Sequence, residues 1–274
     1  MERAAGGRGP IVLLTGAGIS AESGIPTFRG AEGYWTIGSR HYRPMELATW
    51  SAFTEVPDDV WGWYLYRRSV CRAAAPNAAH AAVAGLERSI GDRFLLVTQN
   101  VDGLHLRAGN TLARTFQIHG SIDFMRCAAE CVSDPEPLPE TLGTEWEKGR
   151  PPGPREKDLL RCSRCGGPAR PHVLWFDETY DEPRFRFQSS LQAAIRAELL
   201  VVIGTSGATN LPNQMCEIVA SRGAPMVVVD PEPTPFSELA LGSRAGVFRE
   251  GTACAVMPAL CDEIRRAVAG AGKA

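Results

Sequence analysis

Short apolar runs alternate along this chain with longer segments in which apolar residues recur at helical spacing. Five largely apolar runs are typical of strands buried on both faces of a sheet, and they cover 11–15, 94–98, 115–118, 199–203 and 226–229. Helical spacing marks 44–53, 58–74, 78–90 and 253–268, and Asn77 is the expected N-cap of the helix over 78–90. The alternation predicts an α/β fold with a doubly wound parallel sheet.

Small or polar residues follow each of the five strand runs. In chain order, the first such residues are Gly16, Gln99, His119, Gly204 and Asp230. The carboxyl ends of parallel strands meet at one edge of an open α/β sheet, where ligands bind. We therefore expect the five segments to form one site, although any one of them alone could be an ordinary turn.

The first strand run leads into Gly16-x-Gly18-x-x-Ala21, which matches the dinucleotide fingerprint G-x-G-x-x-G/A. A second turn over 23–26 (SGIP) makes the following helix short, and 28–43 is expected to be a long functional loop. The usual ribose-binding acid is missing after the glycines, and Asp230 is the acid at the end of a later run. A carboxylate there would repel a 2′-phosphate. The pattern therefore favours NAD over NADP.

Four of the eight cysteines form two close pairs, Cys127-x-x-x-Cys131 and Cys162-x-x-Cys165. Four thiolates suit a structural, tetrahedral zinc ion, whereas an empty or redox-active cluster is the alternative. The stretch between the pairs is rich in proline, glutamate and glycine and is expected to be an exposed loop. We predict a zinc-binding module over 127–170, inserted into a Rossmann-like domain over 1–126 and 171–274. The helical region 28–90 then forms the cofactor loop and part of the small domain.

The composition excludes several classes of protein. Of the 274 residues, 44% are hydrophobic and 22% charged, as in a folded globular protein. A formal net charge of −2 gives no general attraction to nucleic acid or to a membrane surface. No apolar stretch approaches the roughly 20 residues of a membrane span, and residues 1–10 lack the apolar core of a signal peptide. We expect a monomeric, cytoplasmic protein without nucleic-acid or membrane partners.

Ordered motifs over roughly residues 10–265 resemble the sirtuins, which are NAD-dependent protein-lysine deacylases. These motifs are 16–20 (GAGIS), 24–29 (GIPTFR), 98–105 (TQNVDGLH), 119–121 (HGS), the paired cysteines and 204–206 (GTS). The resemblance implies a Rossmann-like domain with a small zinc-bearing domain. It also implies acyl-lysine proteins or peptides as substrates, and nicotinamide, O-acyl-ADP-ribose and free lysine as products. The short first helix is then explained, because the chain leaves it to form a mobile loop over the nicotinamide ribose.

The resemblance also implies residue roles. His119 is the base that deprotonates a ribose hydroxyl, for which the pKa of imidazole is suited. Asn100 orients the ribose and a water molecule, and Asp102 holds the nicotinamide carboxamide. His105 shapes the pocket rather than acting as a base. The residues expected to bind NAD are Gly16, Ala17, Gly18, Ile19, Glu22, Thr27, Phe28, Arg29, Tyr34, Trp35, Gln99, Asn100, Val101, Asp102, Gly204, Thr205, Ser206, Asp230 and Ala253.

The expected peptide-binding segment departs from the family pattern His-Val-x-Trp/Phe-Phe-Gly-Glu. It contains Val173, Trp175 and Phe176, but Asp177 replaces the glycine and adds a charge beside the peptide groove. Two further departures concern the NAD site. Asp230 stands where asparagine is common, and 207–210 (GATN) is less apolar than the family pattern.

The arrangement of Ala48, Tyr64 and Arg67 resembles the sirtuin class that removes succinyl, malonyl and glutaryl groups. Alanine leaves room at the floor of the pocket, and a tyrosine hydroxyl with a guanidinium suits a terminal carboxylate. The alternative is a solvated Arg67 and a Tyr64 that only packs in the core. We expect a desuccinylase or demalonylase that retains some deacetylase activity. A deacetylase, a mono-ADP-ribosyltransferase, an NAD hydrolase and a non-catalytic NAD sensor are the alternative functions.

Overall fold

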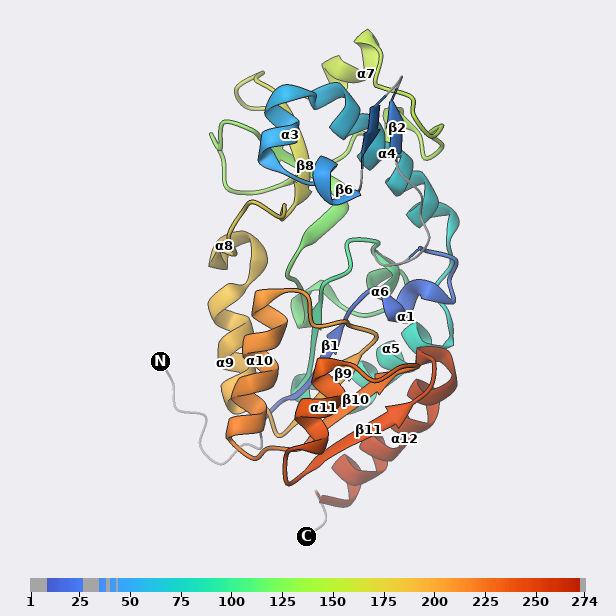
Figure 1. The fold of residues 1–274 in the computed structure, drawn as a ribbon, viewed down its shortest axis with the longest axis vertical. Coiled ribbons are helices and arrows are strands. Elements are labelled where there is room, and N and C mark those ends of the chain that lie inside the picture. Colours follow the sequence, from blue (N-terminus) through green and yellow to red (C-terminus); the bar gives the residue numbers. More distant parts are fainter. Residues whose placement is uncertain (1–8, 27–34, 38–39, 43, 272–274) are drawn as a thin grey trace.

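The computed structural model describes residues 9–26, 35–37, 40–42 and 44–271. Six strands form the central sheet in the order β11-β10-β9-β1-β4-β5 (Figure 1), and every neighbouring pair is parallel. These strands are β1 (Ile11–Thr15), β4 (Phe94–Thr98), β5 (Thr115–Gln117), β9 (Leu199–Ile203), β10 (Met226–Asp230) and β11 (Gly246–Glu250). Strands β4 and β5, which follow β1 in the sequence, lie on one side of β1, and the later strands β9, β10 and β11 lie on the other side. The strand order therefore reverses at β1.

Helices cover both faces of this sheet. Ile11 and Leu13 of β1 belong to one apolar core, which includes residues of α5 (Ala78–Ile90) and α12 (Ala253–Ala271). Val12 and Leu14 belong to a second core on the opposite face. The helices of that second core are α9 (Phe187–Arg196), α10 (Asn210–Ser221) and α11 (Pro235–Leu241). Burial on both faces accounts for the unbroken apolar strand runs.

A third apolar core lies in the smaller part of the molecule, at the top of Figure 1. It is built from α2 (Pro44–Leu47), α3 (Trp50–Glu55), α4 (Pro57–Ala73) and the antiparallel sheet β7-β6-β8. That sheet contains β6 (Gly120–Cys127), β7 (Glu136–Pro137) and β8 (Ala169–Val173). The remaining elements are α1 (Gly18–Ala21), β2 (Trp35–Ile37), β3 (Arg40–Tyr42), α6 (Leu104–Arg107), α7 (Pro154–Leu159), α8 (Glu182–Phe185) and the short 3₁₀ helices Gly91–Arg93, Leu112–Arg114 and Glu140–Leu142.

The structure confirms the doubly wound parallel sheet and the N-cap of α5. The Asn77 Oδ1 accepts the main-chain N–H of Ala79 and of His80, at 3.0 and 3.2 Å, and His80 completes a capping box. Within the described residues, no helix combines the length and apolar character needed to cross a membrane. The domain boundaries at 126/127 and 170/171 stay a prediction, although β6 and β8 extend the small sheet from 120 to 173.

Several expected elements differ from those observed. The prediction of a single helix over 44–53 is wrong, because the chain forms α2 and α3 there. Thr49 separates the two helices and caps α3, and its Oγ1 accepts the Ala52 N–H at 3.0 Å. The prediction of a continuous loop over 28–43 is wrong for 35–37 and 40–42, where β2 and β3 pair as antiparallel strands. The third strand run ends at Gln117, one residue early, and the fifth extends to Asp230. Strand β11, at the sheet edge, is not among the expected strands.

Candidate active site

Two turns that follow the neighbouring strands β1 and β9 are in direct contact. The Gly18 N–H donates to the Gly204 carbonyl at 2.8 Å, and the Gly16 N–H donates to the Ile203 carbonyl at 2.9 Å. A Cβ on Gly18 would lie only 2.6 Å from the Gly204 Cα. This approach of two main chains, at the point where the strand order reverses, leaves no room for side chains. The glycines of the predicted dinucleotide turn are therefore required by the fold itself.

A buried polar network joins the turn after β1 to the turn after β4. The Ser20 hydroxyl donates to Asp102 Oδ2 at 2.7 Å, and the Asn100 amide donates to the Ser20 Oγ at 3.1 Å and to the Gly16 carbonyl at 3.0 Å. The second Asp102 oxygen accepts the Leu104 N–H at 2.8 Å. Burial raises the pKa of Asp102. The predicted residues Asn100 and Asp102 are thus held in one fixed arrangement.

A second network crosses the sheet from β4 to β9. The Gln99 side-chain amide donates to Thr205 Oγ1 at 2.8 Å, and its oxygen accepts from Thr209 Oγ1 at 2.9 Å. Thr209 lies within the stretch that departs from the family pattern, and here it completes the hydrogen bonding of the Gln99 side chain. Gln99 therefore links the two strand ends predicted to bind the two halves of NAD.

His119 follows β5, and its carbonyl accepts the Leu174 N–H at 3.1 Å. Its Nε2 lies 2.7 Å from the hydroxyl oxygen of Tyr180. Burial lowers the pKa of His119 to about 4, and a hydrogen bond with the main chain of Gln99 acts in the opposite direction. The imidazole is therefore neutral at pH 7, as a general base must be before it accepts a proton.

The other predicted NAD-binding residues occupy several environments. Glu22 Oε2 accepts the Cys254 N–H at 3.0 Å, next to Ala253 at the start of α12, and this bond lowers the pKa of Glu22. Asp230 accepts the Glu232 N–H at 3.2 Å at the end of β10, and burial raises its pKa. Ile19 is fully buried in the core against α12, so only its main chain can face a ligand. Thr27, Phe28, Arg29, Tyr34 and the side chain of Trp35 lie outside the described residues.

Two residues of the site, Ser20 and His80, have no individual role predicted from the sequence. In the sequence, Ser20 is noted only as part of the motif over 16–20. In the structure, its side chain bonds both Asn100 and Asp102. His80 and His105 lie behind it with their rings 4.8 Å apart, and His105 Nε2 lies 3.1 Å from Thr15 Oγ1. His105 is thus a buried core residue, which agrees with the prediction that it does not act as a base.

The three residues of the predicted acyl pocket come from α4 and the segment before α3. Tyr64 and Ala48 are buried, and the Tyr64 hydroxyl accepts the indole N–H of Trp175 at 2.8 Å. The guanidinium of Arg67 lies 5.3 Å from the Trp63 ring centroid. Its charge lowers the pKa of Tyr64 and of Asp102, although burial raises both values overall. Arg67 is half-buried and lies three positions after Tyr64, on the same face of α4.

Strand β8 ends at Val173, and the N–H groups of the next three residues all bond within the protein. Those of Leu174, Trp175 and Phe176 donate to the His119 carbonyl, to Glu178 Oε2 and to the Ala48 carbonyl, at 3.1, 2.9 and 3.0 Å. A peptide that pairs with this segment would therefore donate its own N–H groups to the carbonyl oxygens of the segment. Phe176 is 55% exposed, whereas Trp175 is buried.

Asp177 is not a free charge beside the groove. Its two carboxylate oxygens accept the N–H groups of Trp50 and Ser51, at 2.7 and 3.1 Å, at the start of α3. These N–H groups have no partner within the helix, so the aspartate satisfies them. The substitution of glycine by aspartate thus ties the segment after β8 to α3.

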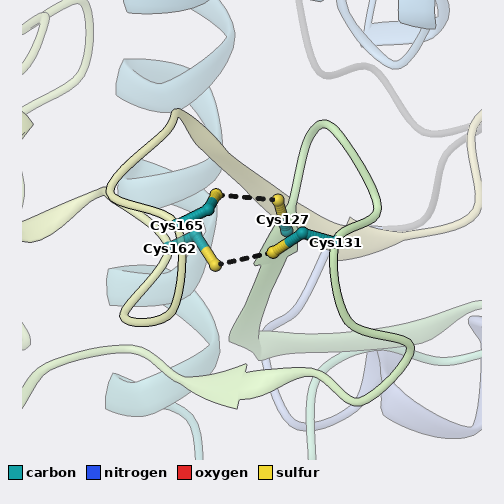
Figure 2. Close-up of side chains that lie close together, drawn as sticks. All are labelled: Cys127, Cys131, Cys162 and Cys165. Carbon is teal, nitrogen blue, oxygen red and sulfur yellow. Dashed lines mark hydrogen bonds between the residues drawn. The ribbon is translucent and has the colours of Figure 1, made fainter.

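Cys127, Cys131, Cys162 and Cys165 form one cluster, with all four sulfur atoms within 4.8 Å of one another. Sγ–Sγ distances of 3.6 Å (Cys127–Cys165) and 3.5 Å (Cys131–Cys162) are drawn in Figure 2. Tetrahedral zinc with Zn–S bonds of about 2.3 Å places sulfur atoms about 3.8 Å apart. The main-chain N–H of Cys131 lowers the pKa of Cys127 to about 7. The four cysteines therefore fit a zinc ion, and the longer first spacing does not prevent it.

The comparisons with known proteins identify the family. Residues 16–210 match the Sir2 family. Two proteins named NAD-dependent protein deacylase, from Leptospira interrogans and Methylococcus capsulatus, are 40% and 42% identical over 93% of this chain and 92% of each relative. A crystal structure of a Sir2 homologue in complex with NAD is 35% identical, with a TM-score of 0.76, over 94% of this chain and 90% of that one. The chain belongs to the Sir2 family, the sirtuins.

Acid is expected to destabilise the fold through its buried histidines. Burial lowers the pKa of His80 and His119 to about 4, and that of His105 and His172 to about 3. The unfolded chain, with histidine pKa values of about 6.5, therefore binds protons that the folded chain does not. The stability is complete above pH 6.5 and falls toward pH 4, by up to about 1.4 kcal/mol per pH unit for each fully buried histidine.

Urea unfolding at pH 7, 6 and 5.5 measures this loss before the carboxylates titrate. His172→Phe is the matched variant, because the His172 ring stacks on Phe185 with centroids 5.8 Å apart and a phenyl ring can replace it. The variant should lose less stability than the wild type between pH 7 and 5.5. Equal losses in the two proteins would contradict the assignment of His172 as a neutral buried group.

Proposed function

We propose that this chain is an NAD-dependent protein-lysine deacylase that prefers succinyl- and malonyl-lysine and also removes acetyl groups. The coarse activity rests on membership of the Sir2 family and on relatives of about 40% identity that carry the name NAD-dependent protein deacylase. The preference for acidic acyl groups rests on Ala48, Tyr64 and Arg67.

The residues at the strand ends support this chemistry. NAD supplies the ribose carbon that receives the acyl oxygen when nicotinamide leaves. The neutral His119 is available to take a proton from a ribose hydroxyl at Nε2. Asn100 and Asp102, both bonded to Ser20, would orient the ribose and the carboxamide. The four cysteines would hold zinc, which cross-links the small sheet and takes no part in proton transfer.

One arrangement carries the acyl preference: the Tyr64 hydroxyl bonds Trp175 in the segment after β8, and the half-buried Arg67 lies three positions further along the same face of α4. The neighbouring Arg68 differs, because it is buried and bonds Asp123 Oδ1 at 3.0 Å as a structural ion pair. Tyr64 accepts from Trp175 and retains its own O–H, so Tyr64 and Arg67 together offer donors to a terminal carboxylate.

Replacing Arg67 with methionine should raise the KM for a succinyl-lysine peptide about 10- to 150-fold and spare the acetyl-lysine peptide. This range corresponds to the roughly 1.5–3 kcal/mol of a hydrogen bond to a charged group. Methionine keeps the length and apolar stem of the side chain, so the contact with Trp63 is retained in part. Steady-state kinetics with two peptides that differ only in the acyl group measure the effect.

Arg155→Met is the control, because Arg155 is an exposed arginine on α7 in the same part of the molecule. It should leave both KM values unchanged. If Arg67→Met reduces activity on the succinyl and acetyl peptides equally, Arg67 has a structural role and the acidic-acyl preference is wrong.

A further inference from the structure

Among the described side chains, Tyr180 is the one that forms a hydrogen bond with His119. Its hydroxyl oxygen lies 2.7 Å from Nε2, and the centroids of the two rings lie 5.8 Å apart. Tyr180 follows the segment after β8, and its ring stacks on Phe187 at the start of α9, with centroids 6.1 Å apart. The tyrosine is therefore held from the side of the large sheet while its hydroxyl reaches the predicted base.

The direction of this hydrogen bond follows from the protonation of both partners. Burial raises the pKa of Tyr180 to about 12, so the phenol keeps its proton at pH 7. The hydrogen bond between His119 and the main chain of Gln99 raises the pKa of His119, which is the effect of donation to a carbonyl. Because Nε2 faces Tyr180, the nitrogen left to donate to Gln99 is Nδ1, and the neutral ring then has its lone pair on Nε2. Tyr180 is therefore the donor and His119 Nε2 the acceptor.

We propose that Tyr180 is a positioning residue for His119 in the ligand-free protein. Its hydroxyl occupies Nε2, the nitrogen to which a ribose hydroxyl of NAD must bind. The inference rests on the proposed function, in which His119 meets that hydroxyl. A general base uses its free lone pair, and here the lone pair is already paired with a phenol O–H. Binding of NAD then exchanges one donor for another at Nε2, and Tyr180 is released before the proton is transferred.

This exchange has a measurable cost for NAD binding. The Tyr180–His119 bond stabilises only the ligand-free state, so its removal should tighten binding. A net hydrogen-bond contribution of about 0.5–1.5 kcal/mol corresponds to a Kd for NAD that is about 2- to 12-fold lower in Tyr180→Phe. The kcat at saturating NAD should stay unchanged, because Tyr180 no longer contacts His119 in the reacting complex.

Titration calorimetry with NAD alone, without peptide, tests the proposal in a double-mutant cycle. The proteins are the wild type, Tyr180→Phe, His119→Ala and the double variant, with Tyr66→Phe of α4 as the tyrosine control. Tyr180→Phe should tighten NAD binding in the wild-type background and have no effect in the His119→Ala background. Tyr66→Phe should leave the Kd unchanged. In the ligand-free wild type, ¹⁵N spectra of His119 should show a pyridine-type, hydrogen-bonded Nε2 whose shift changes in Tyr180→Phe and on addition of NAD.

The proposal is overturned if Tyr180→Phe weakens NAD binding, leaves it unchanged, or tightens it equally when His119 is absent. It is also overturned if kcat falls while binding stays the same, since Tyr180 would then act in the reacting complex. These binding and NMR results do not depend on deacylation. Failure of the wild type to deacylate any acyl-lysine peptide would instead reject the proposed function.

Discussion

Replacing His119 with alanine is expected to lower the deacylation rate by about 10²- to 10⁴-fold, which is the usual contribution of a positioned general base. The imidazole follows β5, and burial keeps it neutral by lowering its pKa to about 4. In the proposed reaction the ring accepts a proton from the ribose. Single-turnover assays with saturating NAD and a succinyl-lysine peptide measure the rate without a contribution from product release.

The variant should keep its fold and much of its NAD binding, because the phosphate end of the site is formed by other strand ends. Thermal unfolding and NAD calorimetry provide these controls. Among the described side chains His119 bonds only Tyr180, and it belongs to none of the three apolar cores, so truncation removes no part of a core. Near wild-type turnover in a folded His119→Ala protein would show that another group takes the proton.

Removal of zinc is the second large effect expected. The chain should contain one zinc ion, and Cys162→Ser should release it and unfold the small sheet. Cys162 is buried beside β7, and its main-chain N–H and carbonyl bond Gly167 and Gly166 at 2.9 Å. Structural zinc sites contribute about 10–16 kcal/mol of binding free energy that is coupled to folding. Elemental analysis and thermal unfolding of the purified proteins measure both effects.

Cys254→Ser is the matched control, since Cys254 lies on α12 and outside the four-cysteine cluster. This variant should retain zinc and the unfolding temperature of the wild type. A Cys162→Ser protein that is zinc-free, stable and active would show that the cluster does not stabilise the small sheet through a metal ion.

The sequence predicted the central strands well and missed the edge strand β11, for a physical reason. Strands β1, β4 and β9 begin and end at the predicted residues, because helices cover both faces and all positions but the final threonines of β1 and β4 are apolar. Strand β11 has only one neighbour in the sheet, β10, and none of its residues is buried. Its sequence therefore lacks the continuous apolar run that marks the others.

The same contrast holds within the candidate site. The rule that ligands bind beyond the carboxyl ends of parallel strands is enough to locate Gln99, His119 and Gly204 from the amino-acid sequence. Tyr180 and Asp177 could not be placed in this way. Tyr180 meets His119 across 61 positions of sequence, and Asp177 meets the start of α3 across 127. Such contacts depend on the packing of segments far apart in the chain.

A competition assay tests the proposed deacylation and its acyl preference in one experiment. The protein is incubated with NAD and equal amounts of three forms of one peptide, which carry succinyl-, malonyl- or acetyl-lysine. The products are followed by mass spectrometry. We expect nicotinamide and O-acyl-ADP-ribose in amounts equal to the free lysine, with the succinyl and malonyl peptides consumed before the acetyl peptide. Faster loss of the acetyl peptide would contradict the acidic-acyl pocket, and nicotinamide release without any free lysine would contradict deacylation itself.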